Sequence, residues 1–437
     1  MNRSITRSSG ISGTRSSGVS GASRWSSGPN PLGLTDLQVA TGVVCDTDRH
    51  GPDVRPVDRH PLVALEAVLR PLLERPPVVV AFSGGRDSSA LLATAVRLAR
   101  AEGLPLPVAL TAFWTGDTDS DEHDWQETVV RSLGIADWER FDPGTDLDLL
   151  GPVARDALRR HGLFWPAPAY SLIPMIQRAR GGTLVSGEGG DQLFGWWPLA
   201  SLRSAVADHR KPSRSEVRHL LLHLSPYRFR YQMARRSVRP YQTWLQPGAV
   251  EAQRIELAAE RAAEPWSWKT YVAQQAASST LRLMLRTMQS FGAAEGAVFA
   301  APLLEARFVA ALGRFGGHTG IGDRSAVMTA VFDGLLPRPV LTRVSKATFG
   351  RVFWGPESRE FARQWSGHGL PADLVNVDAM HQAWLAERPV YGSALPLQAA
   401  WLATQVESAN TPRGVDPVGN QVAPLYSDLN STEGVYS

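Results

Sequence analysis

The most informative pattern in the chain is a run of apolar residues, then two glycines, then a helical repeat. Residues 78–82 read Val-Val-Val-Ala-Phe, which is typical of a strand buried on both faces of a parallel sheet. From Ser88 to Arg100 the apolar residues recur at the spacing of an α-helix. The stretch between them, Ser-Gly-Gly-Arg-Asp at 83–87, is therefore predicted to be the turn that leads from the strand into the helix.

Weaker patterns of the same kind continue along the first half of the chain. A helix over residues 62–73 is expected to break at Pro71, because proline removes a backbone donor. The segment 163–168, Leu-Phe-Trp-Pro-Ala-Pro, is predicted to be a rigid aromatic loop. Since short strands that alternate with helices form parallel sheets, the predicted fold class is α/β. Further strands are predicted over 107–113, 138–141 and 183–186, and further helices over 121–133, 146–161 and 170–180.

The pattern changes after Gly195. It is helical to about Gly292, so the parallel sheet is predicted to end with the fourth strand, and a mostly α-helical C-terminal subregion is expected to follow. Within it, residues 203–239 contain ten Lys or Arg and two acids. This basic stretch has two interpretations, a solvated helix surface or a docking face for an acidic or peptidic substrate.

The composition is that of a soluble globular protein with loose ends. The 437 residues are 43% hydrophobic, which is enough for one large domain or two ordinary ones. A single cysteine, Cys45, excludes a disulfide framework and fits a reducing cytoplasm. The net charge of +3 favours no nucleic acid, and no apolar run is long enough to cross a membrane. Residues 1–40, rich in Ser, Gly and Arg, are predicted to be a disordered tail, with organelle targeting as the alternative, and residues 408–437 to be a flexible tail.

The glycine turn has the features of a phosphate-binding loop. Gly84 and Gly85 let the backbone pass close to an oxyanion, and Ser83 and Ser88 flank them beside a helix start that offers unpaired N–H groups. Asp87 would repel phosphate unless a divalent cation lay between them, and Mg²⁺ prefers this mixture of oxygen ligands. The turn therefore predicts a magnesium nucleotide, with a plain tight turn as the alternative. A Gly-Lys-Ser/Thr ending is missing, which argues against a kinase or GTPase.

A second glycine-rich stretch follows the fourth predicted strand. Because the carboxyl ends of parallel strands meet at one edge of the sheet, its aspartate and Asp87 are predicted to bind one Mg²⁺ together. Its three glycines are predicted to lie against the nucleotide. Its glutamate is a candidate general base, with a hydrogen bond to neighbouring backbone as the alternative. The stretch comprises Gly187, Glu188, Gly189, Gly190 and Asp191.

Three ordered motifs resemble the synthetase domain of glutamine-dependent asparagine synthetases, a family shared with β-lactam synthetases and lasso-peptide macrolactam synthetases. They are residues 83–89, the helix start at Asp121 and Glu122, and residues 187–195. Gln192 departs from the family, where asparagine synthetases commonly carry an acid. Asp121 and Glu122 have two interpretations, helix capping or direct ligand contact.

The resemblance covers residues 60–405. It implies an ATP-pyrophosphatase domain of the adenine nucleotide α-hydrolase type, with a nucleotide half at 60–200 and a mainly helical substrate half at 201–405. It also implies that Lys346 lies over the phosphates of ATP and stabilises developing charge, the alternative being an exposed loop lysine. The segment 295–305 resembles a family motif at the substrate end, although its spacing is stretched and an Arg is missing.

The resemblance also bears on the source of the amine. Glutamine-hydrolysing relatives begin with a catalytic cysteine, whereas position 2 here is Asn2, so no glutaminase is expected. Either the substrate carries its own amine or a partner protein supplies ammonia. Trp244, Trp266 and Trp268 are expected to line a groove for a larger substrate.

The predicted function is an ATP-dependent carbon-nitrogen ligase. It would adenylate a substrate carboxylate, release pyrophosphate and let an amine displace AMP, in the formation of a peptide or natural-product amide or macrolactam. The alternatives are amidation of aspartate with external ammonia, a tRNA-modifying enzyme, and a non-catalytic scaffold. The expected cofactors are ATP and Mg²⁺. The expected partners are a small-molecule or peptide substrate and a peptide-recognition or ammonia-supplying protein, without nucleic acid or membrane.

Overall fold

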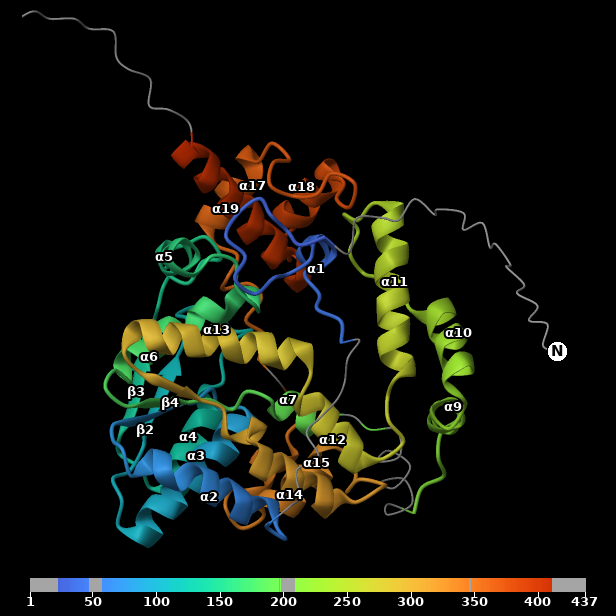
Figure 1. Cartoon of the computed structure of the whole chain (residues 1–437). Helices are drawn as coiled ribbons and strands as arrows, with labels where there is room; N and C mark the ends of the chain where they lie inside the picture. Colours follow the sequence, from blue (N-terminus) through green and yellow to red (C-terminus); the bar gives the residue numbers. More distant parts are fainter. Residues whose placement is uncertain (1–22, 47–56, 196, 198–208, 346, 411–437) are drawn as a thin grey trace, which may run out of the picture.

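The protein is built around one parallel sheet (Figure 1). The computed structural model describes residues 23–46, 57–195, 197, 209–345 and 347–410. The strand order is β3-β2-β1-β4-β5, and each neighbouring pair is parallel. The predicted α/β class and the four predicted strands are confirmed. The strands are β1 (Val78–Ala81), β2 (Val108–Ala112), β3 (Trp138–Phe141), β4 (Thr183–Val185) and β5 (Val298–Ala300).

The order of the strands creates a switch point between β1 and β4. From β1 the chain adds β2 and β3 on one side, and it then returns to add β4 and β5 on the other side. Val80 pairs with Val185, so the loops that follow β1 and β4 begin next to each other. In open α/β sheets, ligands bind in the crevice that such a reversal leaves at the carboxyl ends of the strands.

Helices cover both faces of the sheet (Figure 1). β1 shows why two layers are needed, because Val79 belongs to the hydrophobic core on one face while Val78 and Val80 belong to the core on the other. The first face is covered by α6 (Ile173–Arg178) and α13 (Ser279–Glu295), and the second by α2 (Pro61–Leu73), α3 (Arg86–Glu102), α4 (His123–Leu133) and α14 (Ala306–Gly316).

The other elements connect and flank these layers. None of the helices in the described part of the chain combines the length and hydropathy needed to cross a bilayer. The connecting and flanking elements before β5 are α1 (Asp36–Thr41), α5 (Pro152–His161), η1 (Ala167–Leu172), α7 (Gly190–Leu193), α9 (Arg214–His223), α10 (Tyr227–Ser237), α11 (Pro247–Ala262) and α12 (Trp268–Ala276). After β5 they are η2 (Pro302–Leu304), α15 (Arg324–Phe332), α16 (Arg338–Thr342), α17 (Pro356–Gln364), α18 (Val377–Leu385), η3 (Tyr391–Ser393) and α19 (Ala394–Asn410).

Part of the predicted N-terminal tail is folded. Residues 23–46 include α1, which packs against α19 near the other end of the chain (Figure 1). Trp25 is buried, and its indole N–H donates to the carbonyl of Gly369 at 2.9 Å. The prediction of a disordered tail over 1–40 is therefore wrong for residues 23–40, because a few apolar side chains among the Ser and Gly find a partner in α19. The prediction of a flexible tail over 408–437 is wrong for residues 408–410, which form the end of α19. Residues 1–22 and 411–437 lie outside the described part.

Three predictions of secondary structure were wrong. The sheet does not end with the fourth strand, because β5 adds a fifth. β5 is only three residues long and its Val298 is 58% exposed, so the sequence contains no buried apolar run that would predict this strand. α2 continues through Pro71, which is exposed and lies in the last turn, where water can satisfy the carbonyl that proline leaves unbonded. The helix predicted from residue 146 begins at Pro152, after a series of turns.

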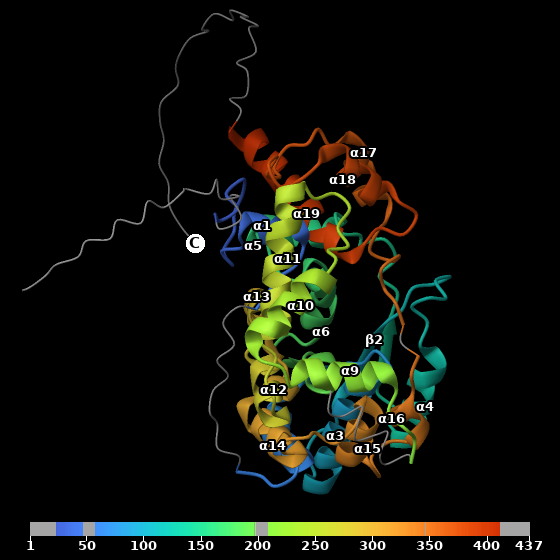
Figure 2. The same ribbon diagram turned by 90° about the vertical axis from the view of Figure 1, so that its right-hand side faces the viewer.

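The basic stretch lies on helices at the side of the molecule (Figure 1 and Figure 2). Of that stretch, residues 209–239 are described, and they form α9 and α10, the latter packed against α11. Apolar side chains are also exposed there, among them Leu221 and Phe229 at 62% and 53%. Such exposure fits both interpretations of the stretch, so the docking face stays a prediction.

The close approach of β1 and β4 at their start gives a mutational test of how these two strands pair. A Cβ atom at Gly182 would lie 1.9 Å from the carbonyl oxygen of Pro77, which accepts the N–H of Thr183 at 2.9 Å. Gly182→Ala is therefore expected to lower the free energy of unfolding by about 2 kcal/mol in urea titrations. In Gly350→Ala the new Cβ meets nothing within 4 Å, and the expected change is below about 1 kcal/mol. If Gly182→Ala proved as stable as wild type, the close approach of β1 and β4 at this position would be contradicted.

Candidate active site

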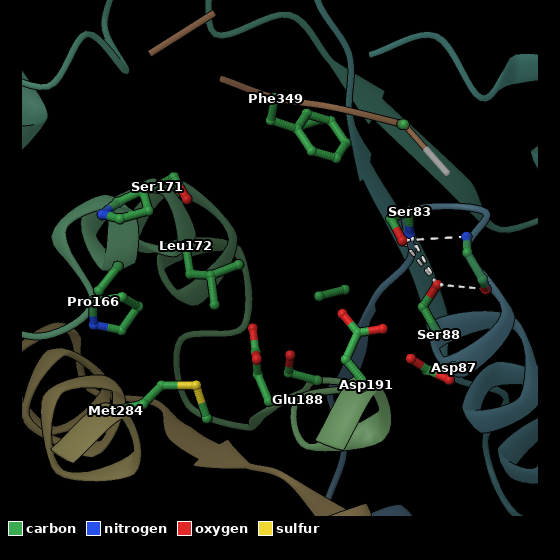
Figure 3. Close-up of a pocket in the computed structure, with 18 of the residues that line it drawn as sticks. Ser83, Asp87, Ser88, Pro166, Ser171, Leu172, Glu188, Asp191, Met284 and Phe349 are labelled. Carbon is green, nitrogen blue, oxygen red and sulfur yellow. Dashed lines mark hydrogen bonds between the residues drawn. The ribbon is translucent and has the colours of Figure 1, made fainter. Parts of the chain in front are cut away.

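A cavity of about 690 Å³ lies at the switch point, beyond the carboxyl ends of β1 and β4. The loops after these strands line one part of it, and η1, α6 and α13 line another. In Figure 3 the glycine turn occupies one side, Pro166, Leu172 and Met284 the opposite side, and Glu188 and Asp191 the floor between them. The fold therefore gathers residues from distant parts of the chain around one space.

The glycine turn is held in shape by its own side chains. The Ser88 hydroxyl accepts the N–H of Ser83 at 3.3 Å and donates to the carbonyl of Gly85 at 3.1 Å (Figure 3). Behind the turn, the amide of Gln126 donates to the carbonyl of Ser83 at 3.1 Å. Gly85 is the N-cap of α3 and has no side chain to cap the first N–H groups of that helix. These N–H groups suit an anion, as the sequence predicts.

The predicted nucleotide contacts divide into two groups. Ser83, Gly85, Asp87, Ser88 and Gly187 line the cavity. The other three, Gly84, Gly189 and Gly190, do not, so the structure does not bear out direct contact at these positions.

These three glycines shape the backbone instead. Gly84 and Gly189 have φ of 81° and 90°, which favours glycine. A Cβ at Gly189 would lie 2.3 Å from a methyl carbon of Leu304, and one at Gly190 would lie 2.3 Å from the carboxyl carbon of Asp87. Any side chain at 190 would push the two loops apart, so glycine there is what lets them meet.

Asp87 and Asp191 converge on a single guanidinium group. Arg324 donates from Nη2 to Asp87 at 2.6 Å and from Nη1 to Asp191 at 2.5 Å. Arg324 is the first residue of α15, far along the chain from both loops. The two carboxylates are therefore neighbours, and a cation stands between them.

The electrostatics around Asp87 favour a bound cation. Burial has the largest effect on the pKa of Asp87 and raises it; Arg324 opposes this rise, and the charge of Asp191 adds to it. The Oδ1 atom of Asp87 is buried with no hydrogen-bond partner in the described part of the chain. An unsatisfied carboxylate oxygen of this kind is suited to a metal.

Magnesium fits the donor set as a nucleotide-bridging ion. Among the described residues no group of three or more His, Cys, Asp or Glu could hold a metal alone. Mg²⁺ often binds through one or two carboxylates plus phosphate oxygens and water, which is what Asp87 and Asp191 would offer. Their role as metal ligands stays a prediction.

The two residues of the acidic helix start have different roles. The side chain of Asp121 accepts the N–H of His123, the first residue of α4, at 2.9 Å, which confirms the capping interpretation for Asp121. The side chain of Glu122 forms an ion pair that neither interpretation anticipated. Arg343 donates to both Glu122, at 2.7 Å, and the carbonyl of Gly84, at 3.0 Å. The side chain of Glu122 also accepts the N–H of Ala347 at 2.9 Å, and although Glu122 is the N-cap residue of α4, its carboxylate makes no hydrogen bond to the first turn of that helix. This buried ion pair and the hydrogen bond of Ala347 fasten Arg343 and Ala347 to the residues around the glycine turn.

Lys346 lies outside the described residues. Its neighbours Ser345 and Ala347 line the cavity, so the predicted position over the phosphates stays open to test. Glu188 lines the cavity as well, and its carboxylate points into the space (Figure 3). Its role as a general base is a prediction that its position allows.

A comparison with protein-family models identifies the family of the chain. The asparagine synthase model matches residues 64–402 of the chain. The chain belongs to the asparagine synthase family. Members of this family are ATP-dependent ligases that release AMP and pyrophosphate. A search of curated proteins finds no match.

This family member departs from several expectations at the substrate end. Glu295 lies outside the cavity lining and binds Arg160 and Arg180, so it has a structural role. Trp244 and Trp268 are fully buried in the hydrophobic cores, and none of the three tryptophans lines the cavity, which corrects the predicted groove. Trp244 lies in a turn and Trp268 is the first residue of α12, so no helical period marks either of them as a core position.

We expect Arg324 to make a pH-dependent contribution to the stability of this asparagine synthase family member. In Arg324→Met the carboxylates of Asp87 and Asp191 lose their cation, which is expected to cost about 2 kcal/mol at pH 7. That value allows for solvent screening, because Asp191 is 48% exposed. The stabilisation needs ionised Asp87, so it is lost as the pH falls through the pKa of Asp87, which burial raises.

Urea titrations of wild type and Arg324→Met at several pH values measure this effect. The difference in unfolding free energy is expected to shrink between pH 7 and pH 4. Arg131→Met is the control, because Arg131 is 79% exposed and its surface pair contributes little. A difference that stays constant over this range would show that Arg324 does not act through the carboxylates.

Proposed function

We propose that this protein forms an amide bond by adenylating a substrate carboxylate with ATP and then letting an amine displace AMP. The observation that carries the proposal is the meeting of Asp87 and Asp191 on Arg324, beside the uncapped start of α3. Two carboxylates next to a phosphate-binding loop are suited to a magnesium triphosphate and serve no purpose in a plain turn.

ATP would bind with its phosphates at the glycine turn. Ser83, Gly85 and Ser88 line this part of the cavity. Asp87 and Asp191 would hold Mg²⁺, which when bound supplies positive charge between the carboxylates and the phosphates. Arg324 would then release one or both carboxylates and remain beside the phosphates as a second cation.

In the first step an oxygen of the substrate carboxylate attacks the α-phosphorus. A new O–P bond forms, the bond from the α-phosphorus to the bridging oxygen breaks, and pyrophosphate leaves. The first N–H groups of α3 and, by the family resemblance, Lys346 would stabilise the negative charge that develops. Holding both reactants in one cavity removes much of the entropic cost of their encounter.

In the second step the amine nitrogen attacks the acyl carbon, and the C–O bond to AMP breaks. The proton released by the nitrogen would pass to Glu188, whose carboxylate points into the cavity (Figure 3). The product is an amide or, where acid and amine belong to one molecule, a lactam.

The substrate class is proposed from the size of the site. A volume of about 690 Å³ lies in the usual range for drug-sized ligands, about 300–1,000 Å³. A peptide or natural-product acid fits such a space beside the nucleotide. The exposed basic stretch of α9 and α10 would offer a docking face to a peptide-carrying partner protein.

Product analysis tests the proposal. The protein would be incubated with ATP, magnesium and a panel of acids comprising aspartate, N-acetyl amino acids and short synthetic peptides. We expect acid-dependent exchange of labelled pyrophosphate into ATP and, with hydroxylamine added as the nucleophile, AMP together with a hydroxamate. Formation of ADP and phosphate, or no exchange with any acid of the panel, would contradict the proposal.

Glu188→Gln separates the two steps. Pyrophosphate exchange with the most active acid of the panel is expected to stay within about threefold of wild type, because Glu188 does not act on phosphorus. Amide formation from an amine that is protonated at neutral pH is expected to fall about 100-fold through loss of the base. Glu127→Gln serves as the control, because Glu127 is a surface residue of α4 with a side chain that is 45% exposed and it does not line the cavity. Equal losses in both steps would assign Glu188 to binding instead.

A further inference from the structure

The cavity has two halves of opposite chemistry. The glycine turn, Asp87 and Asp191 form a polar half, whereas the opposite half is apolar (Figure 3). The apolar half is supplied by the loop before η1, by η1 and α6, by α13 and by the segment after residue 347. Its apolar members are Trp165, Pro166, Pro168, Ala169, Leu172, Met175, Leu281, Met284, Met288, Phe349 and Phe353.

This apolar wall is built into the core. Leu281, Met284 and Met288 are 1%, 6% and 2% exposed, on the face of α13 that packs toward η1 and α6. Methionine side chains are flexible and polarizable, so they fit ligands of varied shape. The wall is therefore a fixed surface with adaptable side chains.

The charged side chains among the described lining residues lie in the other half of the cavity and on its floor. Among the described residues that line the cavity, the cations are Arg86, Arg324 and Arg343. Arg324 is paired with both aspartates and Arg343 with Glu122, while Arg86 begins α3 beside the turn. On the apolar side the polar side chains are hydroxyls such as those of Ser171 and Thr280.

We infer that the acyl group activated here carries an aromatic or branched apolar side chain, which lies against the wall formed by Leu172, Met284 and their neighbours. This inference rests on the proposed function and specifies its substrate. A free aspartate fits poorly, because its second carboxylate would face this wall, where the described residues supply no cation, and would approach Glu188, a like charge.

Stable mimics of the acyl-adenylate test the inference without turnover. Three probes share the nucleoside: 5′-O-sulfamoyladenosine, its N-(3-phenylpropanoyl) derivative and its N-succinyl derivative, which carries a second carboxylate. Binding to wild type is measured by calorimetry in magnesium buffer. We expect the phenylpropanoyl probe to bind at least about tenfold tighter than the succinyl probe, from burial of the ring on the wall.

Two wall variants and one control locate the effect. Leu172 is half-buried and points into the cavity, so Leu172→Lys is expected to reduce the preference for the phenylpropanoyl probe to below about threefold. Met284→Gln, a change of similar volume, is expected to weaken that probe and leave sulfamoyladenosine unchanged. Leu385, the last residue of α18, is 39% exposed and does not line the cavity, so Leu385→Lys is expected to behave as wild type.

The outcomes separate this inference from the proposed function. If the succinyl probe binds as tightly as the phenylpropanoyl probe or tighter, the apolar acyl site is wrong and adenylation stands. If none of the three probes binds, the adenylate site itself is wrong. If both wall variants keep the full preference for the phenylpropanoyl probe over the succinyl probe, the phenyl ring does not bind against this wall.

Discussion

Two carboxylates that come from different loops and share one cation are the interaction on which the rest of the site depends. In the structure the cation is the guanidinium of Arg324, which bonds Asp87 at 2.6 Å and Asp191 at 2.5 Å. Without a cation, two like charges about 4 Å apart near a protein surface repel by about 4 kcal/mol. The placement of these two carboxylates next to each other at the start of α3 is stable only because that repulsion is offset. A charge requirement of this kind suits a magnesium triphosphate, whose metal and phosphates bring both signs of charge to the same place.

The fold is arranged so that the two loops can meet. β1 and β4 are neighbours because the chain reverses its direction of growth between them, and each strand ends in a glycine-containing loop. Gly190 has no side chain where the carboxyl group of Asp87 lies, so the loops approach to van der Waals distance. The buried pair of Glu122 and Arg343 then ties the segment that leads to Lys346 to the same turn. Sheet topology, one glycine and one ion pair thus converge on a single site.

Much of this could be predicted from the sequence, and the failures have physical causes. The strand and turn around Asp87 were predicted because their pattern is local, and Asp191 was placed next to it because parallel strands share a carboxyl edge. Arg324 was missed because nothing in its neighbourhood marks a residue that acts across the fold. β5 was missed because three residues with one face exposed carry no period. The role of Glu122 depends on Arg343, which is distant in the chain, so no local pattern could distinguish a cap from a buried pair.

The central claim concerns magnesium and the two aspartates, and nucleotide binding tests it without knowledge of the acid or the amine. Titration calorimetry of ATP would be carried out with magnesium and with EDTA, on wild type, Asp87→Asn and Asp191→Asn, with Glu127→Gln as an exposed-acid control. The account predicts magnesium-dependent binding in wild type and in the control, and a loss of at least about tenfold in each aspartate variant. Binding that is as tight in both aspartate variants as in wild type, or that does not respond to EDTA, would contradict it.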